Sequence, residues 1–423
     1  MTRRHKRSRV RGRSLILLVA LGATAGAALV ATAPADAATG AGTRAGTGTG
    51  AGAGVPVATG VSYRQYDLRA AAGTTHAHVL DVDLANPRVR LGLLYRGAVA
   101  ARAPVSALAD RQQAVAGVNG DFFDISEAQH PGVAVTGSSV GPAVANGRAL
   151  KGAVPDAQRF GPPLPPGTHT RAVVGVGTDG RARTDSLTLH GSYTAGGRRL
   201  ALGGVNQYAL PENSVGAYTS DWGGVSRRRA TCGTDSDRAG ACSARTYEVT
   251  LRRGRVVSAS ATPGSGTVAA GTTVLVGREA GAQRLKTLLE GERVTVRYGL
   301  TSASGTEYRF AVGGYPVLSH GEPLPGLDTT RSAVRTAVGI AADGRRVFLL
   351  ALDGAAVYRR GLTVAEVAAA LRNLGADEGF SLDGGGSSTL VARQPGASRV
   401  TVRNHPSDGA ERPVPNGIGV FSR

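Results

Sequence analysis

Apolar and polar residues alternate along several short stretches of the chain, which is the pattern of half-buried β-strands. Residues 78–84, HVLDVDL, alternate in this way, and the turn NPR leads from them into VRLGLL at 89–94. Later stretches place a Gly turn between two apolar runs, and two of these turns are Asp-Gly, the strongest short signal for a β-hairpin. These stretches cover residues 173–183, 247–261 and 338–352. Hairpins of short strands therefore dominate the predicted structure.

Helical periodicity is confined to three stretches, at residues 104–117, 279–291 and 363–375. In the third, Thr363 is a suitable N-cap, Glu366 completes a capping box, and Gly375 can end the helix. Helices and strands do not alternate as they do in a parallel β-α fold. The pattern predicts an α+β fold, in which a mixed, hairpin-rich β-sheet domain carries a few packed helices.

The first 37 residues have the three parts of a secretory signal peptide. Seven Arg and Lys residues occur before residue 14, an uncharged apolar stretch covers 14–33, and Ala35 and Ala37 form an Ala-x-Ala cleavage site. A retained membrane anchor is the alternative, because the apolar stretch is near spanning length. Its second half consists of Ala, Gly and Thr with one Leu and one Val, which suits a cleavage region better. We expect a secreted, extracellular or wall-associated protein with no stable membrane span after cleavage.

Residues 38–60, rich in Gly, Thr and Ala, are predicted to be a flexible linker, with ordered structure beginning near Val61. The remainder, 61–423, is predicted to form one domain whose C-terminal core covers about 305–423. The Pro-rich loop at 160–168 could divide the chain, but no clean domain boundary follows it.

The formal charge of the whole chain is +19, and part of it lies in the predicted signal peptide. Removing that segment leaves 42 basic and 29 acidic residues, a net charge of +13 carried almost entirely by arginine. Such a surface suits anionic polymers such as teichoic acids. A general preference for arginine codons explains the same charge. No basic run is interleaved with aromatic residues, so the sequence gives no support for nucleic-acid binding.

The two cysteines, Cys232 and Cys242, flank a polar loop. In an exported protein an isolated pair of this kind favours a disulfide. A metal site would need further ligands, and no histidine is close in sequence.

The stretch GFSLDGGGSSTLV, residues 379–391, places three glycines and two serines directly after an aspartate. It follows a predicted helix and strand and lacks a lysine, so neither a P-loop nor a dinucleotide-binding motif fits. We expect a strand–turn–strand tip with Asp383 as a carboxylate for acid–base or nucleophilic work. The amides of the three glycines would form an anion-binding nest, supported by two hydroxyl groups. The residues of this nest are Gly384, Gly385, Gly386, Ser387 and Ser388. A tight turn without function is the alternative.

Three further stretches offer candidate chemistry. GVNGDFFD at 117–124 contains two carboxylates near a predicted strand end, although Asn, Gly and Asp are also ordinary turn residues. Arg335 and Thr336 enter a strand that pairs with another ending at Asp353, and strand alternation places these two neighbours on opposite faces. The C-terminal segment NHPSDGAERPVPNGIGVF at 404–421 adds Asp408, Glu411 and Arg412.

Taken together, these stretches resemble the phosphodiester glycosidase family, in the family's order and over roughly residues 76–423. The resemblance also includes AVGGYPVLSHG at 311–321, and Asp-Gly-Gly-Gly-Ser-Ser is its most specific part. It implies hydrolysis of a sugar whose anomeric oxygen is linked to a phosphodiester; in the family's lysosomal enzyme, the sugar is N-acetylglucosamine. The expected products are a free sugar and a phosphomonoester.

The resemblance, combined with the residue types, suggests roles at this site. The catalytic candidates are Asp383, Asp121 as its partner, and Asp353 in a secondary position. Arg335 is expected to hold the phosphate, because its guanidinium can bind an oxyanion through two hydrogen bonds. The other substrate-binding candidates are Asn119, Gly120, Thr336, Gly384, Gly385, Gly386, Ser387, Ser388 and Arg412.

Two questions about chemistry remain open at this stage. Clustered aspartates can bind a divalent cation, but no metal-ligand spacing requires one, so no cofactor or metal site is predicted. The expected partner is a phosphodiester-linked glycan or wall polymer. The alternative functions are a non-catalytic protein that binds wall glycans and a phosphodiesterase that cleaves the P–O bond.

Overall fold

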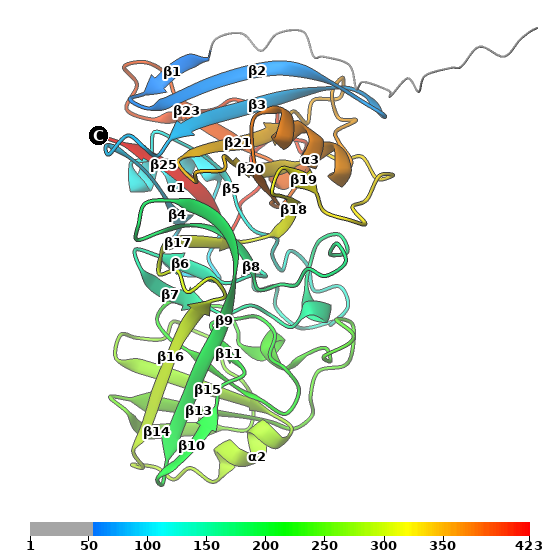
Figure 1. Cartoon of the computed structure of the whole chain (residues 1–423). Helices are drawn as coiled ribbons and strands as arrows, with labels where there is room; N and C mark the ends of the chain where they lie inside the picture. The colour runs from blue at the N-terminus through cyan, green and yellow to red at the C-terminus, as the bar shows by residue number, and fades with distance from the viewer. Residues whose placement is uncertain (1–53) are drawn as a thin grey trace, which may run out of the picture. The chain divides into compact units, whose positions relative to one another are not determined.

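Antiparallel β-sheets make up most of the molecule, shown in Figure 1 as a computed structural model that describes residues 54–423. The predicted signal peptide and most of the predicted linker lie outside the described residues. Among the strand pairs of the described part, only the short pair β11–β12 is parallel. The expectation of hairpin-rich sheets with a few helices is confirmed.

Four sheets are present in residues 54–423. The first has the order β1 (Val55–Ala58), β2 (Val61–Ala70), β3 (Gly73–Asp83), β21 (Arg346–Leu352), β20 (Thr336–Ile340), β22 (Glu378–Ser381), β18 (Tyr315–Ser319) and β19 (Glu322–Pro323). The second has the order β10 (Arg198–Ala201), β9 (Ala182–Ala195), β8 (Ala172–Gly177), β17 (Tyr308–Gly313), β6 (Ala143–Ala145) and β7 (Arg148–Lys151), with β16 (Val294–Ser302) also paired to β9.

Two smaller sheets complete the set. The third has the order β11 (Gly204–Val205), β12 (Val215–Tyr218), β15 (Thr272–Arg278), β13 (Thr246–Arg252) and β14 (Arg255–Ser260). The fourth has the order β24 (Val400–Val402), β23 (Leu390–Arg393), β5 (Ala116–Asn119), β25 (Asn416–Ser422) and β4 (Val89–Tyr95). The helices are α1 (Val105–Gln112), α2 (Ala280–Lys286) and α3 (Val364–Asn373).

The start of the ordered structure differs from the prediction. The strand β1 lies inside the segment expected to be a flexible linker, where it pairs with β2. Its sequence, Val-Pro-Val-Ala, offers apolar residues that the preceding Gly/Thr/Ala repeat lacks. Because Val57 and Ala58 pack against the core, order begins before Val61.

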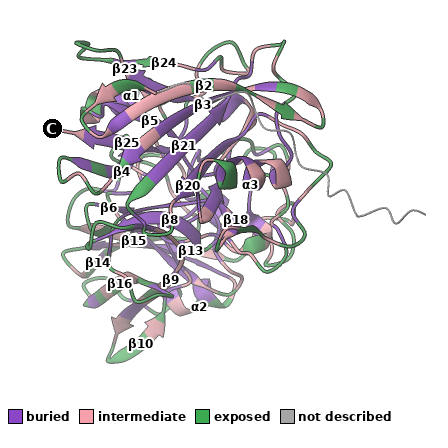
Figure 2. Ribbon diagram, turned by 45° about the horizontal axis from the view of Figure 1, so that its top comes forward, coloured by how far each residue is buried: buried purple, intermediate pink, exposed green. Residues whose placement is uncertain are grey.

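The hairpins expected from the Gly turns are present. β8 and β9 are joined around Asp179-Gly180, β13 and β14 around Arg253-Gly254, and β20 and β21 around Asp343-Gly344. β20 and all but the first residue of β21 are buried, because they are central in the first sheet (Figure 2). Because these strands are buried and paired on both sides, they hold the residues at their ends in fixed positions.

Helix α3 begins as the sequence predicts. The Thr363 hydroxyl accepts a hydrogen bond from the Glu366 amide (3.2 Å), and the Glu366 carboxylate accepts one from the Thr363 amide (2.8 Å). Gly375 follows the last turn at a φ of 95°, which favours glycine. The helix packs against β18 and β22 of the first sheet.

The chain passes from the first sheet to the fourth directly after β22. It leaves β22 at Ser381, makes one short 3₁₀ turn at Gly385–Ser387, and enters β23 at Leu390. The predicted strand–turn–strand tip is therefore confirmed, and its two strands belong to different sheets.

We predict that Thr363→Ala lowers the free energy of unfolding by about 1 kcal/mol, because one reciprocal cap hydrogen bond of α3 is lost. Chemical denaturation followed by circular dichroism would measure this change. Thr363→Ser keeps the hydroxyl and should stay close to the wild type. Equal stability of Thr363→Ala and wild type would contradict the assigned role of the capping box.

Candidate active site

Asp383 and Asp121 lie close together where the first and fourth sheets meet. Asp383 follows β22 of the first sheet, and Asp121 follows β5 of the fourth. The Asp383 amide donates to the Gly120 carbonyl (2.9 Å), and Asn119 Nδ2 donates to the Asp383 carbonyl (2.7 Å). Two motifs that are far apart in sequence are therefore joined directly through their backbones.

The Asp121 carboxylate is buried and only partly satisfied. Its Oδ2 accepts a hydrogen bond from the Gly141 amide (2.6 Å), whereas its Oδ1 has no hydrogen-bond partner within residues 54–423. Close packing holds it in place, since a Cβ added to Gly313 would lie 2.4 Å from Oδ2. Burial raises the pKa of Asp121 to about 6.

Asp383 lies beside this carboxylate but is only partly buried. Burial raises its pKa to about 6; hydrogen bonds from Ser387 and Gly384 and the charge of Arg412 oppose this shift, while the charge of Asp121 adds to it. Raised pKa values on two neighbouring carboxyl groups suit a division into acid and base.

Lys151 is a buried cation beside Asp121. Its Nζ donates to the Gly152 carbonyl (2.7 Å), the Val140 carbonyl (3.3 Å) and the Gly141 carbonyl. Burial lowers the pKa of Lys151 to about 7, and the charge of Asp121 opposes this shift. The positive charge of Lys151 in turn favours the ionised form of Asp121.

Arg159 is a second buried cation beside Asp121 and Asp383, which we call the acid pair. Its guanidinium carbon lies 4.5 Å from the centre of the Phe122 ring and 5.4 Å from that of the Tyr315 ring. Burial lowers its pKa, while the charges of Asp121 and Asp383 are among those that raise it. Its Nη2 is buried without a hydrogen-bond partner in the described part of the chain. A planar donor with a free N–H beside two carboxylates is suited to an oxyanion.

Sequence reasoning missed both of these cations. Lys151 carried a signal, because the chain has only three lysines against 46 arginines, and the choice of lysine at a buried strand end is unusual in such a chain. Arg159 carried none, because an arginine before a Pro-rich loop in an arginine-rich sequence resembles a surface residue.

Arg412, a secondary candidate from the sequence, does lie at the acid pair. Its Nη2 donates to Asp408 Oδ2 (2.6 Å), and its Nη1 lies 3.4 Å from Ser387 Oγ. A Cβ added to Gly386 would lie 2.2 Å from both Arg412 Nη2 and Asp408 Oδ2. A larger residue at 386 would therefore displace this ion pair, which lies against the backbone.

The glycine amides are arranged differently from the expected anion nest. The Gly384 amide donates to Asp383 Oδ1 (3.0 Å), and the Gly385 amide donates to the Val334 carbonyl (2.8 Å). Gly385 has a φ of 60°, which the tight turn demands. Two of the three amides thus hold the turn and the carboxylate, so they are not free for a phosphate.

Thr336, Asn119 and Ser388 form a buried hydrogen-bonded cluster beneath the acid pair. Thr336 Oγ1 donates to Asn119 Oδ1 (2.8 Å) and contacts Ser388 Oγ (3.1 Å). The Thr389 amide also donates to Asn119 Oδ1 (3.1 Å). Because Asn119 is fully buried and both of its side-chain polar atoms have partners within the protein, these residues position Asp383 and do not reach a sugar directly, in contrast to the role expected for Asn119.

Arg335 does not face the acid pair. Its Nε donates to the Leu362 carbonyl (3.1 Å) and its Nη2 donates to the Arg331 carbonyl (2.9 Å). Thr336 turns toward Asn119 while Arg335 turns to the loop before α3, as strand alternation predicted. The expected phosphate-binding role of Arg335 is therefore not supported, and Arg159 and Arg412 are the cations at this place.

Asp353 belongs to a separate cluster. Its Oδ2 accepts from His405 Nδ1 (2.9 Å), and its Oδ1 accepts from the amides of His405 (2.9 Å) and Ala355 (3.2 Å). Although burial raises its pKa, these hydrogen bonds lower it overall. Asp353 therefore fixes the loop at His405, and it is not a third member of the acid pair.

Comparison with known proteins bears on this arrangement. Residues 245–421 match a family model described as phosphodiester glycosidase. The chain therefore contains a phosphodiester glycosidase family domain. The family resemblance inferred from the motifs is confirmed over residues 245–421, a shorter range than the 76–423 expected. The matched segment of this phosphodiester glycosidase domain includes Asp383, Thr336 and Arg412, whereas Asp121 and Arg159 come from the part before it.

Solved structures share the fold of this chain. A hypothetical protein from Synechocystis is 19% identical with a TM-score of 0.64, covering 86% of this chain and 62% of its own. A second structure is that of a Burkholderia pseudomallei protein whose name describes it as exported. It is 23% identical with a TM-score of 0.61, and the match covers 82% of this chain and 74% of that one. This chain therefore spans less than two thirds of the Synechocystis protein.

A third structure is the catalytic domain of zebrafish N-acetylglucosamine-1-phosphodiester alpha-N-acetylglucosaminidase, auto-inhibited by its pro-peptide. It is 14% identical with a TM-score of 0.42, covering 89% of this chain and 87% of that one. No curated protein matches the chain in sequence.

Two features bear on the compartment of this protein. Cys232 and Cys242 form the expected disulfide. Within residues 54–423, no helix has the length and apolar character needed to cross a membrane. The disulfide is the kind of bond that persists in oxidising surroundings outside the cytoplasm.

We predict that Asp383→Asn stabilises the fold at pH 7.5 and leaves it nearly unchanged at pH 4. The pKa of Asp383 is raised in the folded state, so the unfolded chain releases this proton first and wild-type stability falls as pH rises from about 4 to 6. The gain at pH 7.5 should be about 1–2 kcal/mol, below the full value of the shift because the side chain is partly solvated. Urea unfolding at both pH values tests this; destabilisation at pH 7.5 would contradict it.

Proposed function

We propose that this protein hydrolyses the glycosidic bond of a sugar-1-phosphodiester, such as an N-acetylglucosamine-like sugar, to give free sugar and a phosphomonoester. The observation that carries the proposal is the acid pair: the segments that carry Asp121 and Asp383 are hydrogen-bonded to each other, and the charges of both residues act on the buried Arg159, whose Nη2 has no partner in the described part of the chain. The family match agrees with this chemistry.

The reaction breaks the bond between the anomeric carbon and the phosphodiester oxygen. Water supplies a hydroxyl group to the carbon, and its proton passes to the ionised carboxylate of the pair. The leaving oxygen takes both bonding electrons and remains on the phosphomonoester. Because a phosphate oxygen is already a stable leaving group, the protonated carboxyl has little general-acid work to do, and an ionised carboxylate beside the oxocarbenium-like carbon supplies the larger stabilisation.

The cations divide into two roles in this proposal. Arg159 and Arg412 bind the phosphate oxygens, where negative charge increases as the bond breaks. Lys151 makes only backbone contacts and faces Asp121, so it keeps that carboxylate ionised rather than binding substrate. The buried cluster of Asn119 and Thr336 sets the distance between the two aspartates.

We further propose that the protein acts outside the cytoplasm, secreted or associated with the cell wall. Support comes from the predicted signal peptide, from the disulfide, and from the similar Burkholderia protein, whose name describes it as exported. A phosphodiester-linked glycan is the kind of substrate that such a location supplies.

We predict that hydrolysis of an N-acetylglucosamine-1-phosphodiester in ¹⁸O-labelled water places the label in the sugar. Asp383→Asn and Asp121→Asn should each lower kcat by at least about 10²-fold, the usual size of a positioned acid–base contribution. Mass spectrometry of both products measures the position of the label.

The same assay separates the alternatives. Label in the phosphate would indicate P–O cleavage and an ordinary phosphodiesterase. No turnover by a folded protein, across several sugars, would favour a non-catalytic glycan-binding protein. Unchanged kcat in both variants would show that the acid pair does not act on the substrate.

We predict that Arg159→Gln lowers kcat/KM for the phosphodiester about 10–100-fold, since a charge-assisted hydrogen bond to an anion contributes about 1.5–3 kcal/mol. Arg346→Gln removes an equal charge from an exposed ion pair with Asp81 and should leave kcat/KM unchanged. Steady-state kinetics on both variants makes the comparison, and equal losses in the two would contradict a specific role for Arg159.

A further inference from the structure

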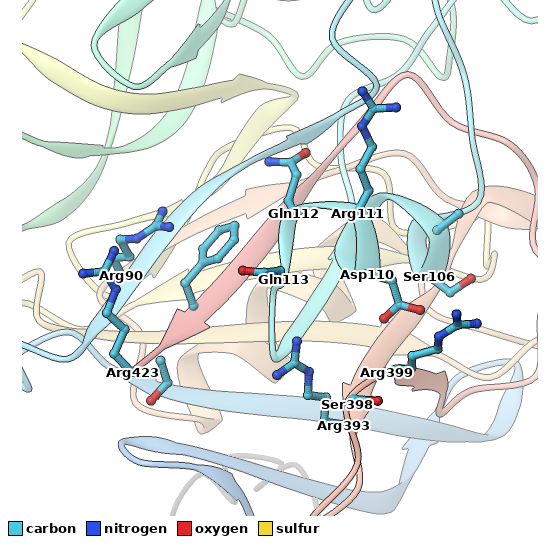
Figure 3. A pocket seen from close by; sticks show the side chains of 13 residues that line it. Arg90, Ser106, Asp110, Arg111, Gln112, Gln113, Arg393, Ser398, Arg399 and Arg423 are labelled. Atoms are coloured by element: carbon cyan, nitrogen blue, oxygen red, sulfur yellow. The ribbon is translucent and has the colours of Figure 1, made fainter.

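A recess of about 1050 Å³ lies beside α1, next to the last residues of β25 and the turn between β23 and β24 (Figure 3). Five arginines line it: Arg90, Arg111, Arg393, Arg399 and Arg423. Asp110 is the one acidic side chain in the lining, and its Oδ1 accepts a hydrogen bond from the Val400 amide (2.9 Å). The recess is therefore strongly positive.

The five arginines are not neutralised by the protein. None of them forms an ion pair with an acidic side chain within residues 54–423, whereas eight arginines elsewhere in that range do. Those eight are Arg148, Arg183, Arg227, Arg229, Arg278, Arg346, Arg372 and Arg412. Burial and the neighbouring charge of Arg423 lower the pKa of Arg90, which shows that the cations act on one another. Even if Asp110 and the α-carboxylate of Arg423 are both counted, three net positive charges remain, and they favour an anionic ligand.

A second, smaller recess of about 350 Å³ continues this surface. Ala107 and Arg111 line both recesses, so α1 separates them and Arg111 is shared. In Figure 3, Arg111 extends away from Arg393 and Arg399. The second recess adds Arg96 and Arg102 and includes Pro413. We call the seven arginines of the two recesses the arginine track: Arg90, Arg96, Arg102, Arg111, Arg393, Arg399 and Arg423.

The arginine track leads toward the acid pair. Pro413 directly follows Arg412, whose Nη1 lies 3.4 Å from Ser387 Oγ beside Asp383. At the far end, Ser422 of β25 lines the first recess, while Asn416 at the start of the same strand binds the Asp121 amide (3.0 Å). A strand of this length spans about 20 Å. A single diester cannot reach both ends, but a polymer with repeated phosphates can.

The lining favours a glycan over a nucleic acid. Sequence-tolerant binding of single-stranded nucleic acid uses exposed aromatic faces for base stacking. The one aromatic residue of either recess is Phe421, which is buried and covered by the Arg90 guanidinium 4.0 Å from its ring centre. Gln113 and Ser398 also line the first recess, and their polar groups suit sugar hydroxyls.

We propose that the arginine track binds the phosphodiester backbone of a polymeric glycan and delivers it to the acid pair. This inference rests on the proposed function and narrows its substrate, from any sugar-1-phosphodiester to a polymer of several phosphodiester-linked units.

The test uses two charge-matched double variants. Arg111→Gln/Arg399→Gln changes the track, and Arg252→Gln/Arg297→Gln removes two exposed arginines from β13 and β16. The probe is a fluorescent oligomer of eight N-acetylglucosamine units joined by 1-phosphodiesters. Its binding is measured by anisotropy over a range of salt concentrations, in the Asp383→Asn background so that no hydrolysis occurs.

We expect the track variant to bind this oligomer at least tenfold more weakly, and the control variant to bind within twofold of the parent. The slope of log affinity against log salt should become shallower by roughly 1–1.5, as for the loss of two phosphate contacts on a single strand. With Asp383 restored, the track variant should show a raised KM for the oligomer and unchanged kinetics on a monomeric diester.

Three outcomes would overturn the inference. They are equal weakening in both double variants, no weakening in either, and equally tight track-dependent binding of single-stranded DNA with the same number of phosphates. Failure of the proposed function can be told apart from failure of this inference. If the oligomer binds through the track but is not hydrolysed when Asp383 is present, the glycosidase activity is rejected and the binding surface is retained.

Discussion

The site depends on the side chain of Asn119, which joins two sheets at one point. Its Nδ2 holds the carbonyl of Asp383, and its Oδ1 accepts from Thr336 and Thr389. Each of these partners belongs to a segment that changes direction there: the end of β22, the start of β20 and the entry to β23. Replacing this buried amide would be costly, because the groups of Asp383, Thr336 and Thr389 that bond to it would be left without a hydrogen-bond partner. The geometry of the acid pair follows from this junction.

The charges around that junction are largely removed from solvent. Two carboxylates with pKa values of about 6 lie near two buried cations, and one of those cations keeps an N–H unpaired. Such an arrangement lowers stability at neutral pH, because burial disfavours the ionised carboxylates. Its persistence is understandable if an anionic substrate completes the network, since phosphate oxygens accept from Arg159 and from Arg412 without displacing the hydrogen bonds that hold the turn.

Local features of the fold were predictable, and long-range ones were not. The capping box at Thr363, the Asp-Gly hairpins and the disulfide depend on residues close in sequence, so short patterns identified them. The convergence of 117–124 with 379–391 was inferred through a family resemblance, because no local rule links them. Arg335 shows where sequence reasoning stops. Strand alternation correctly placed Arg335 and Thr336 on opposite faces of β20. Which of the two residues faces the acid pair depends on how β20 pairs with β22, and the sequence alone does not determine that pairing.

The glycine triplet shows why composition alone gave an incomplete answer. Its glycines meet different constraints. Gly384 lies against the Val334 carbonyl, 2.6 Å from an added Cβ, and Gly385 has a φ of 60°. Gly386 lies against the Arg412–Asp408 ion pair, which a larger residue would displace. The bare backbone therefore admits protein groups rather than a bound phosphate. A glycine-rich turn beside a carboxylate indicates close approach, and only the surrounding chain decides whether a ligand or an arginine makes that approach. Here an arginine does, and the amides of Gly384 and Gly385 are bonded within the protein, so an anion at this site would be held mainly by side chains.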